Sequence, residues 1–472
     1  MKGSLSYILS VCSYHWYVLI YQKMKKSIAL SLLPVILMIL SLSLFAQQAD
    51  TAVATIPALS DTLKPDTVKP KKDCQQQAVG DLIHNLFGKN KKEKAPKPPK
   101  KFMALILPNI SSNPSNGFLL GIGGTFGWYM GPKTTTRVSA APFTVAVTSK
   151  KQLISFVKSN IFTKEDNYFL QGDWRFYLYS QPTYGLGTNA PDSGNIPSEF
   201  HWDGEGGDLD SAAFPMKYNY VRFHEIVNRK VVKNFYAGMG YHFDYYYSID
   251  DEKLNLDSTP ILNTPHYAYS TKYQYNNTEY MLSGISANLV YDSRDNQANP
   301  YKGIYANLNY RYNFTWLGSS ENSSELWAEF RAYVGLSKKT PRHLIAFWAF
   351  GDFNVTGHMP YMTLPNLGGD QRARSGRGYT NGRFRGPNLV YGEVEWRFPI
   401  TPCSKILGGV IFANATTTDN PDRGVGLFQY IKPAVGFGLR VMVNKHFRTN
   451  INLDFAFGSK SSGFYFSGQE TF

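Results

Sequence analysis

An arginine set between two glycines and followed by a tyrosine is the clearest place where this sequence could do chemistry. Residues 375–379 read Ser-Gly-Arg-Gly-Tyr, and the candidate residues are Gly376, Arg377, Gly378 and Tyr379. Because glycine adopts backbone conformations closed to other residues, this segment can bend sharply and direct one guanidinium inward. A guanidinium pairs with a carboxylate through two parallel hydrogen bonds. The pattern therefore predicts a binding and positioning role for Arg377.

Carboxylates suited to this arginine follow on a predicted strand. Glu393 and Glu395 alternate there with Val394 and Trp396. Because successive side chains of a strand point to opposite faces, both carboxylates share the polar face. We expect a bidentate pair between Arg377 and Glu395 that holds the loop inside a polar lumen. The alternative is that Arg377 is one of several solvated arginines in its loop.

The sequence holds no constellation typical of an enzyme. The motifs of serine hydrolases, zinc proteases and P-loop proteins are missing from it. His242 and Asp244 could form an acid/base pair on one strand, but polar inward residues are expected on every strand of a barrel. Three cysteines, Cys12, Cys74 and Cys403, make neither a disulfide framework nor a metal site, although a Cys74–Cys403 bridge remains open. We predict no enzyme, no cofactor and no metal.

The composition excludes several classes of protein. The 472 residues are 43% hydrophobic and 15% aromatic, with a mean hydropathy of −0.30. A helical membrane bundle would need several apolar runs of about 20 residues, and a disordered chain would be poor in aromatics. The net charge is +14, much of it in a lysine-rich segment without a nucleic-acid-binding motif, so no nucleic acid partner is expected.

From residue 102 onward, apolar and polar residues alternate with a period of two, as in residues 302–315. The runs are about 10–14 residues long, enough to cross a bilayer at a tilt, whereas strands of soluble sheets average about 5–6 residues. We expect an all-β fold, a transmembrane antiparallel barrel of about 16 strands, with about 14 or about 18 as alternatives. The first strand is placed at 102–108 and the last at 463–472.

The connections support this count. Those after even-numbered strands are short, and the long ones, 181–216, 249–278 and 356–387, all follow odd-numbered strands. Short periplasmic turns and long external loops are typical of outer-membrane barrels. The predicted location is therefore the bacterial outer membrane.

Two segments precede the barrel, which is placed at 102–472. Residues 1–46 are placed as a signal peptide, because residues 24–46 have its short basic start and apolar core, and Met24 is a second plausible start of the chain. Residues 47–101 are rich in proline and lysine, which predicts a disordered periplasmic linker, interrupted by a short helix at 79–88. Asp-Thr-apolar triplets in the linker resemble the O-glycosylation triplet of Bacteroides-type bacteria.

Three stretches of residues 280–472 resemble the BamA/TamA-type bacterial surface-antigen barrels of the outer membrane. The first, VYDSRDNQANPYKGIYANLNY, resembles the family's D-x-R-D…P-x-x-G turn. The second is the Arg-Gly-aromatic loop followed by a Glu-x-Arg-Phe-Pro strand, and the third is the tail with its terminal aromatic. The turn residues are Asp292, Arg294, Asp295, Pro300 and Gly303.

The resemblance implies that the loop folds inward and that Arg377 contacts acidic residues on strands 12 and 13. This chain departs from the pattern, because Asn414 stands where strand 13 of the family usually offers an aspartate. The contact would therefore depend on Glu395 more than usual. The resemblance also implies that the last strand, with Gly468 and Phe472, is the signal recognised by assembly machinery. Alternatively, Phe472 is an aromatic of the interfacial girdle.

Two functions follow from the resemblance. The protein would assist insertion, assembly or translocation of outer-membrane proteins, with a weakly paired seam between the first and last strands as an edge for a client strand. A first strand ending at Pro108 would suit such a seam. The alternative is a passive pore or transport conduit gated by the loop. Residues 47–101 are too short for the POTRA-type periplasmic modules of the family, so we expect membrane lipid and either nascent outer-membrane proteins or a periplasmic protein as partners.

Overall fold

The computed structural model describes most of the chain from the start of the predicted barrel. The described residues are 102–113, 117–191, 213–259, 261–338, 340–371, 373–401, 404, 406–444, 448–468 and 470–472. The predicted signal peptide (1–46), the linker (47–101) and its short helix (79–88) lie outside them. Cys74 and Cys403 also lie outside the described residues, so a bridge between them stays a prediction.

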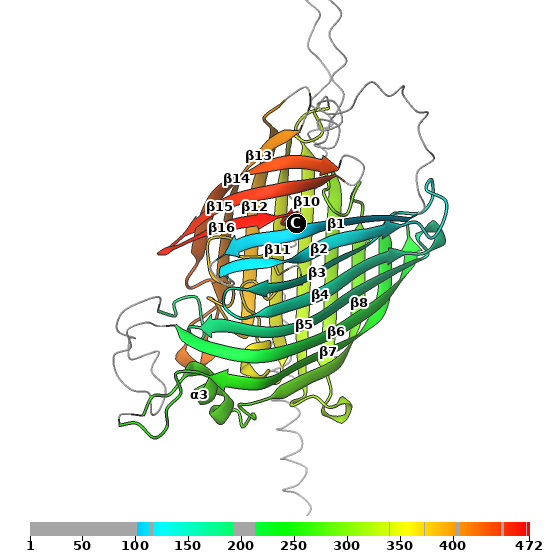
Figure 1. Ribbon diagram of the computed structural model, residues 1–472. Coiled ribbons are helices and arrows are strands. Elements are labelled where there is room, and N and C mark those ends of the chain that lie inside the picture. Colours follow the sequence, from blue (N-terminus) through cyan, green and yellow to red (C-terminus); the bar gives the residue numbers. More distant parts are fainter. Residues whose placement is uncertain are drawn as a thin grey trace, which may run out of the picture. The chain divides into compact units, whose positions relative to one another are not determined.

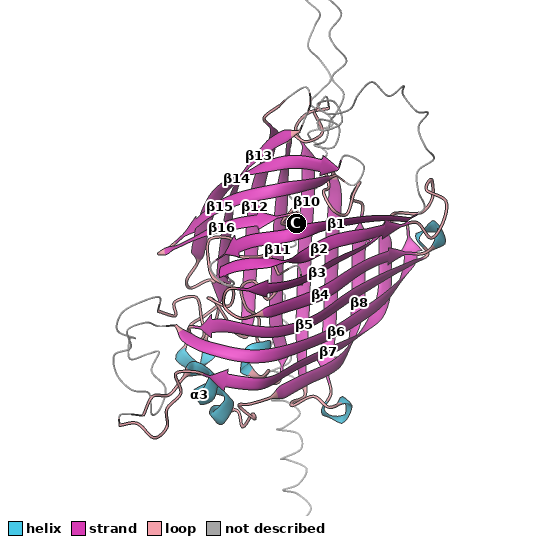
Figure 2. Ribbon diagram, viewed as in Figure 1, coloured by secondary structure: helices cyan, strands magenta, loops and turns pink. Residues whose placement is uncertain are grey.

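Sixteen antiparallel strands form one sheet in which each strand pairs with its neighbours in sequence, and the sheet curves into a nearly closed barrel (Figures 1 and 2). The predicted all-β barrel is confirmed, and among the described residues the strand count is sixteen, not the alternative of about 14 or about 18. The strands are β1 Phe102–Asn113, β2 Gly117–Trp128, β3 Ser139–Thr148, β4 Leu153–Phe162, β5 Tyr168–Thr183, β6 Phe214–Val232, β7 Phe235–Asp251, β8 Tyr280–Asp292, β9 Gly303–Asn313, β10 Ser323–Gly335, β11 Leu344–Thr356, β12 Asn388–Pro399, β13 Leu407–Thr418, β14 Lys432–Asn444, β15 Thr449–Gly458 and β16 Ser461–Ser467.

Long loops follow β5, β7 and β11, as the sequence predicts. The loop after β7 contains α3, Pro265–Lys272, which the sequence did not predict. The start of this helix is marked in the sequence by an N-cap residue and a proline. The Thr264 hydroxyl accepts a hydrogen bond from the backbone N–H of Tyr267 at 3.2 Å, and the proline stands in the first turn. No helix among the described residues is both long and apolar enough to span a bilayer. The short 3₁₀ helices are η1 Lys164–Asp166, η3 Thr315–Leu317, η4 Tyr361–Thr363 and η5 Pro421–Arg423.

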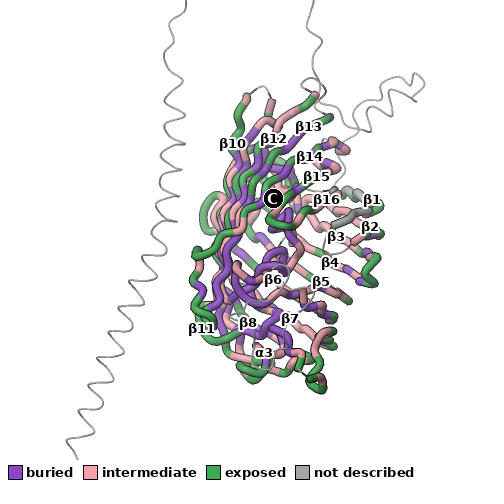
Figure 3. The backbone as a smooth tube through the Cα atoms, turned by 90° about the vertical axis from the view of Figure 1, so that its left-hand side faces the viewer, coloured by how far each residue is buried: buried purple, intermediate pink, exposed green. Residues whose placement is uncertain are grey.

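Alternation along the strands separates a lipid-facing surface from a polar lumen. On β12, Glu393, Glu395 and Arg397 are buried, whereas Val394 and Trp396 are 38% and 44% exposed. Figure 3 shows the same alternation of buried and exposed residues along the other strands. The lumen is therefore lined by charged and polar side chains whose contacts with the inner loop and the tail form the candidate site.

The first and the last strand of the barrel have other bounds than predicted. β1 does not end at Pro108 but continues to Asn113, with Pro108 opposite Ile122 of β2. A strand with a neighbour on one side only can hold a proline, because one of its edges needs no ladder hydrogen bond. β16 ends at Ser467, so the last residues of the predicted strand 463–472 leave the sheet.

A seam separates the two end strands. β1 and β16 lie side by side (Figure 1), yet among the described residues the ladder runs from β1 to β16 without closing between them. The barrel therefore has two strand edges that meet without a continuous set of backbone hydrogen bonds.

Candidate functional site

The loop between β11 and β12, residues 357–387, turns inward at two glycines. Gly376 and Gly378 have φ angles of +81° and +104°, which side-chain-bearing residues rarely adopt. A Cβ on Gly378 would lie 2.9 Å from the Cβ of Ala434 and 3.2 Å from the backbone N of Gly458. Glycine is required there because the loop backbone packs directly against β14 and β15.

These glycines place the Arg377 guanidinium among three carboxylates. Its Nη1 donates to Oδ2 of Asp454 on β15 at 2.7 Å, and its Nη2 donates to Oε1 of both Glu393 and Glu395 on β12. The Arg377 side chain is only 4% exposed, and its Cζ lies 3.5 Å from the centre of the Phe412 ring. The guanidinium is thus held by charge and by an aromatic face.

The carboxylates keep Arg377 charged. Burial alone would lower the pKa of its guanidinium, but Glu393, Glu395 and Asp454 together raise that pKa well above its usual value. The group is a permanent cation that can bind and position, and it cannot serve as an acid or base.

Two further predicted residues attach the same loop to the wall. The Asn414 side chain on β13 donates from Nδ2 to the backbone carbonyl of Arg377 at 3.0 Å. The Tyr379 hydroxyl donates to the Pro433 carbonyl at 2.7 Å. The backbone N–H of Gly378 donates to the Tyr465 hydroxyl on β16 at 3.0 Å. The loop therefore contacts every strand from β12 to β16.

The contacts of Arg377 differ from the expected bidentate pair with Glu395. Nη2 is shared between two glutamates, and the other oxygen of Glu395 accepts from Nε of Arg397 at 2.6 Å. The acidic residue missing from strand 13 is replaced by Asp454 on β15, which sequence reasoning missed. Its place on the polar face of its strand could be predicted, but the strand's distance from the loop could not.

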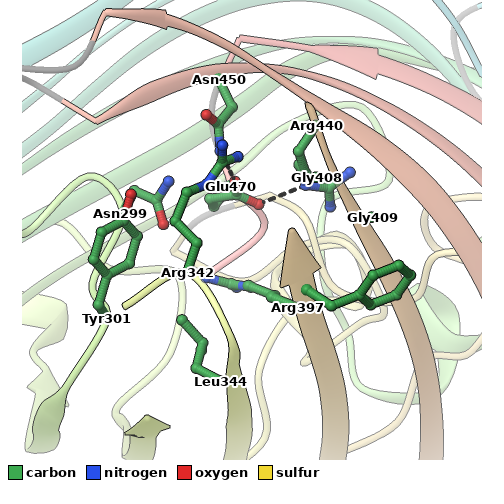
Figure 4. Close-up of a pocket in the computed structure, with 11 residues that line it drawn as sticks. Asn299, Tyr301, Arg342, Leu344, Arg397, Gly408, Gly409, Arg440, Asn450 and Glu470 are labelled. Atoms are coloured by element: carbon green, nitrogen blue, oxygen red, sulfur yellow. Dashed lines mark hydrogen bonds and ion pairs between the residues drawn. The ribbon is translucent and has the colours of Figure 1, made fainter. Parts of the chain in front are cut away.

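Glu470, in the tail after β16, lies beside Arg440 and Asn450 (Figure 4). Arg440 donates from Nε to Oε2 of Glu470 at 2.8 Å, and Asn450 donates from Nδ2 to Oε1 at 2.6 Å. The Glu470 carbonyl accepts a hydrogen bond from Arg374 of the inner loop. Glu470 thus joins the loop, β14 and β15.

Phe472 is buried in the lumen and does not belong to the interfacial girdle. It is 1% exposed, and its ring centre lies 5.4 Å from that of Trp348 and 6.2 Å from that of Tyr333. Arg397 donates from Nη2 to the Phe472 carbonyl at 3.1 Å. Gly468, where the tail leaves β16, is exposed and a Cβ there would meet nothing within 4 Å. A role of these two residues as an assembly signal stays a prediction.

A small pocket, open in part to solvent, lies beside the tail (Figure 4). Three arginines and one glutamate line it, so its wall is rich in positive charge. Its lining residues are Asn299, Tyr301, Arg342, Leu344, Arg397, Phe398, Gly408, Gly409, Arg440, Asn450 and Glu470.

The predicted turn motif lies between β8 and β9, away from Arg377. Asp292 is fully buried and accepts from Nε and Nη2 of Arg294, each at 2.9 Å. The pair fixes the start of the turn.

The other turn residues close it. The Asp295 carboxylate accepts from the Tyr301 N–H at 2.9 Å and from Nη1 of Arg448 at 2.8 Å, and Pro300 is buried beside it. Gly303 has a φ of +108°, and a Cβ there would lie 2.5 Å from the Ser293 carbonyl. These residues shape a turn and connect it to the β14–β15 hairpin.

His242 and Asp244 do not form a pair. Asp244 accepts from Nε of Arg222 at 2.8 Å and from Nη1 of Arg311 at 2.6 Å, and it contacts Nε2 of His224 at 2.8 Å. His242 instead contacts a serine hydroxyl at 2.7 Å. Asp244 is therefore the centre of an ion-pair cluster that spans β6 to β9.

Comparison with known proteins gives a family for this barrel. The Omp85 superfamily domain matches residues 154–472. No curated protein matches the chain. BamA from Haemophilus ducreyi lacking POTRA domains 1–3 is similar at 14% identity and a TM-score of 0.48, over 77% of this chain and 69% of that chain. CdiB from Acinetobacter baumannii is similar at 12% identity and a TM-score of 0.44, over 79% of this chain and 60% of that chain.

Proposed function

Because the chain belongs to the Omp85 superfamily and is an outer-membrane β-barrel, we propose that it assists the insertion, assembly or translocation of other outer-membrane proteins. The observation that carries this proposal is the seam, where β1 and β16 meet without a ladder between them. An unpaired strand edge is a template for an incoming strand. The client would add to this edge while it leaves the periplasm.

Contacts between the loops support a route through the seam. The loops at the outer mouth bind one another: the Gly187 N–H donates to the Arg385 carbonyl at 2.8 Å, and Arg383 donates to the Ala190 carbonyl at 2.7 Å. Arg377 holds the inner loop below them. In this proposal Arg377 acts as a latch that keeps the lumen shut while the seam works.

A cross-link across the seam tests the route. In a background with Cys74 and Cys403 replaced by serine, cysteines at outward positions of β1 (Phe102, Ala104, Ile106) are scanned against Phe464 and Phe466 of β16. A pair that forms a disulfide is then assayed in liposomes for acceleration of folding of a urea-denatured outer-membrane protein.

The proposal expects the oxidised pair to abolish acceleration and a reductant to restore it. The control is a disulfide between Ile285 and Tyr312, which face each other in an ordinary ladder of β8 and β9, and it should leave acceleration unchanged. Equal acceleration with the seam locked and unlocked would rule out the route through the seam.

A passive pore gated by the loop is the second candidate, and the positively charged pocket beside the tail favours it. Planar-bilayer conductance of wild type, Arg377→Ala and the exposed-loop control Arg423→Ala separates the two. An assembly barrel is expected to be nearly closed, with steady conduction only in Arg377→Ala. A large and stable conductance, equal in all three proteins, would establish the pore and contradict the latch.

A further inference from the structure

The lipid-facing surface of the described strands carries one charged residue away from the strand ends, Glu225 on β6. Its outward neighbours on the same strand, Phe223 and Val227, are 42% and 50% exposed. The other charged residues on the outward face of β6, Lys217 and Arg229, lie toward the two ends of the strand. Outward positions in the middle of the other described strands are apolar, aromatic, small or hydroxyl-bearing. Glu225 is thus an exception that needs an explanation.

The carboxylate packs against residues of the two preceding strands, β4 and β5. Gly172 of β5 stands opposite Glu225 in the ladder, and a Cβ there would lie 2.9 Å from Oε1 of Glu225 and 2.6 Å from Oγ of Ser159. Oε1 accepts from Nε1 of Trp174 at 2.8 Å. The missing side chain at Gly172 therefore lets the carboxylate and the Ser159 hydroxyl lie over the backbone of β5, with the carboxylate hydrogen-bonded to the Trp174 indole.

The register places the Glu225 carboxylate within the apolar band. Arg229, paired with Tyr168, marks the periplasmic end of the band, and Asn219, paired with Tyr247, marks the outer end. Glu225 lies four residues from Arg229, about 13 Å along the strand at ~3.3 Å per residue. At a strand tilt of ~40° this is about 10 Å into an apolar band that is about 25 Å tall. A lone carboxylate at such a depth is unfavourable unless a donor reaches it.

We propose that Glu225 binds a membrane-spanning segment of another protein that carries a lysine or arginine within its apolar stretch. Charge complementarity selects this occupant, because the neutral Trp174 indole gives the carboxylate a hydrogen bond but no counter-charge. A second copy of this chain brings no cation at that depth, since Glu225 is the one charged residue in the middle of the described outward positions. A lipid ammonium group would have to leave the headgroup region by about 10 Å.

Glu225 is remote from the seam. β6 is separated from β1 by β2 to β5 and from β16 by β7 to β15. A partner bound there would leave the seam free, so this inference can fail or succeed independently of the route proposed for clients.

The test uses the full folded chain in phosphatidylcholine vesicles, whose lipids have no primary amine. The probes are two synthetic leucine/alanine helices with a photo-reactive group next to the central residue, which is lysine in one and leucine in the other. The lysine helix should label β5 to β7 of wild type about tenfold more than the leucine helix does. Glu225→Gln should abolish the difference, and Glu225→Lys should prefer a helix with a central glutamate.

The matched control is Val221→Gln, which adds an amide at another outward position of β6 and should leave labelling unchanged. The heat-dependent gel mobility of each variant reports that the barrel is folded. Equal labelling of wild type by the lysine and leucine helices would overturn the proposal. So would suppression of the lysine preference in phosphatidylethanolamine vesicles, because the lipid amine would then be the occupant.

Discussion

The guanidinium of Arg377 donates to the Asp454 carboxylate at 2.7 Å, although the two residues belong to an inner loop and to β15. The same guanidinium also contacts Glu393 and Glu395 on β12. β15 is the neighbour of β16, the last strand before the seam. One buried cation therefore links the inner loop to β12 and to β15, the strand next to β16 at the seam.

Replacing Asp454 by asparagine should destabilise the barrel. Arg377 and Arg440 both pair with Asp454, and removing one partner of a buried ion pair typically costs about 3–5 kcal/mol. We expect a lower urea midpoint for refolded Asp454→Asn than for wild type. The control, Asp257→Asn in an exposed loop, should keep the wild-type midpoint. Equal midpoints for both variants would show that Asp454 does not hold the loop.

Alanine at Gly378 should be far more harmful than alanine at Gly392. The first position combines a φ of +104° with a Cβ 2.9 Å from Ala434, whereas a Cβ at Gly392 meets nothing within 4 Å. A strained backbone of this kind costs about 1–3 kcal/mol. The urea midpoint should fall for Gly378→Ala and stay nearly constant for Gly392→Ala. A harmless Gly378→Ala would mean that the loop can move away from β14.

The strands could be predicted because their signal is local. Alternation within each strand, together with the parity of loop lengths, indicated sixteen strands whose bounds agree with the structure to within a few residues, except at the two ends. The ends could not be predicted, because Pro108 looks like a strand terminator unless the strand is known to lie at an edge. Gly463 to Phe472 also look like one strand unless the lumen is known to receive the tail.

The site could be predicted only where its residues are close in sequence. Arg377 and the glutamates of β12 are close in the sequence, and alternation along β12 places both glutamates on the polar face. Their proximity to Arg377 could therefore be inferred. Asp454 and Glu470 reach the same place through the curvature of the barrel, which no sequence pattern encodes. Residues joined by closure of the sheet are therefore the ones that the sequence could not supply.

Phe472→Ala should lower the stability of the folded barrel, independently of any role of Phe472 as an assembly signal. The side chain is 1% exposed against Trp348, and truncation of a buried phenylalanine costs about 3–5 kcal/mol. Phe464 on β16 is 37% exposed on the lipid face, so Phe464→Ala is the matched control and should cost less. Refolding in vitro, without assembly machinery, followed by urea unfolding measures both. Wild-type stability of Phe472→Ala would leave only the assembly-signal role for this residue.

The tail should loosen in acid through Glu470. Burial alone would raise the pKa of its carboxyl, but Arg440 and Arg397 lower that pKa below its usual value. Because the folded-state pKa is the lower one, its stabilisation is present above the unfolded value of about 4.3 and is lost as pH falls through the folded value. The difference in urea midpoint between wild type and Glu470→Gln should therefore shrink between about pH 6 and about pH 3. A constant difference would show that the charge of Glu470 contributes nothing.

A double-mutant cycle between Arg377 and Asp454 should measure how much the contact between the inner loop and β15 contributes to the stability of the barrel. Side chains in one buried ion-pair network show coupling energies of about 0.5–3 kcal/mol. Asp454 also binds Arg440, so the effect of Asp454→Asn should exceed its coupling with Arg377→Ala, and a second cycle with Arg440→Ala should account for the remainder. Urea unfolding of the single and double variants gives both values.

If Asp454 couples to Arg440 alone, the loop only rests against β15, and a movement of Arg377 could not be transmitted to the strand beside the seam. If both couplings are substantial, release of the loop and weakening of β15 are one event, and a seam that opens must also release the latch.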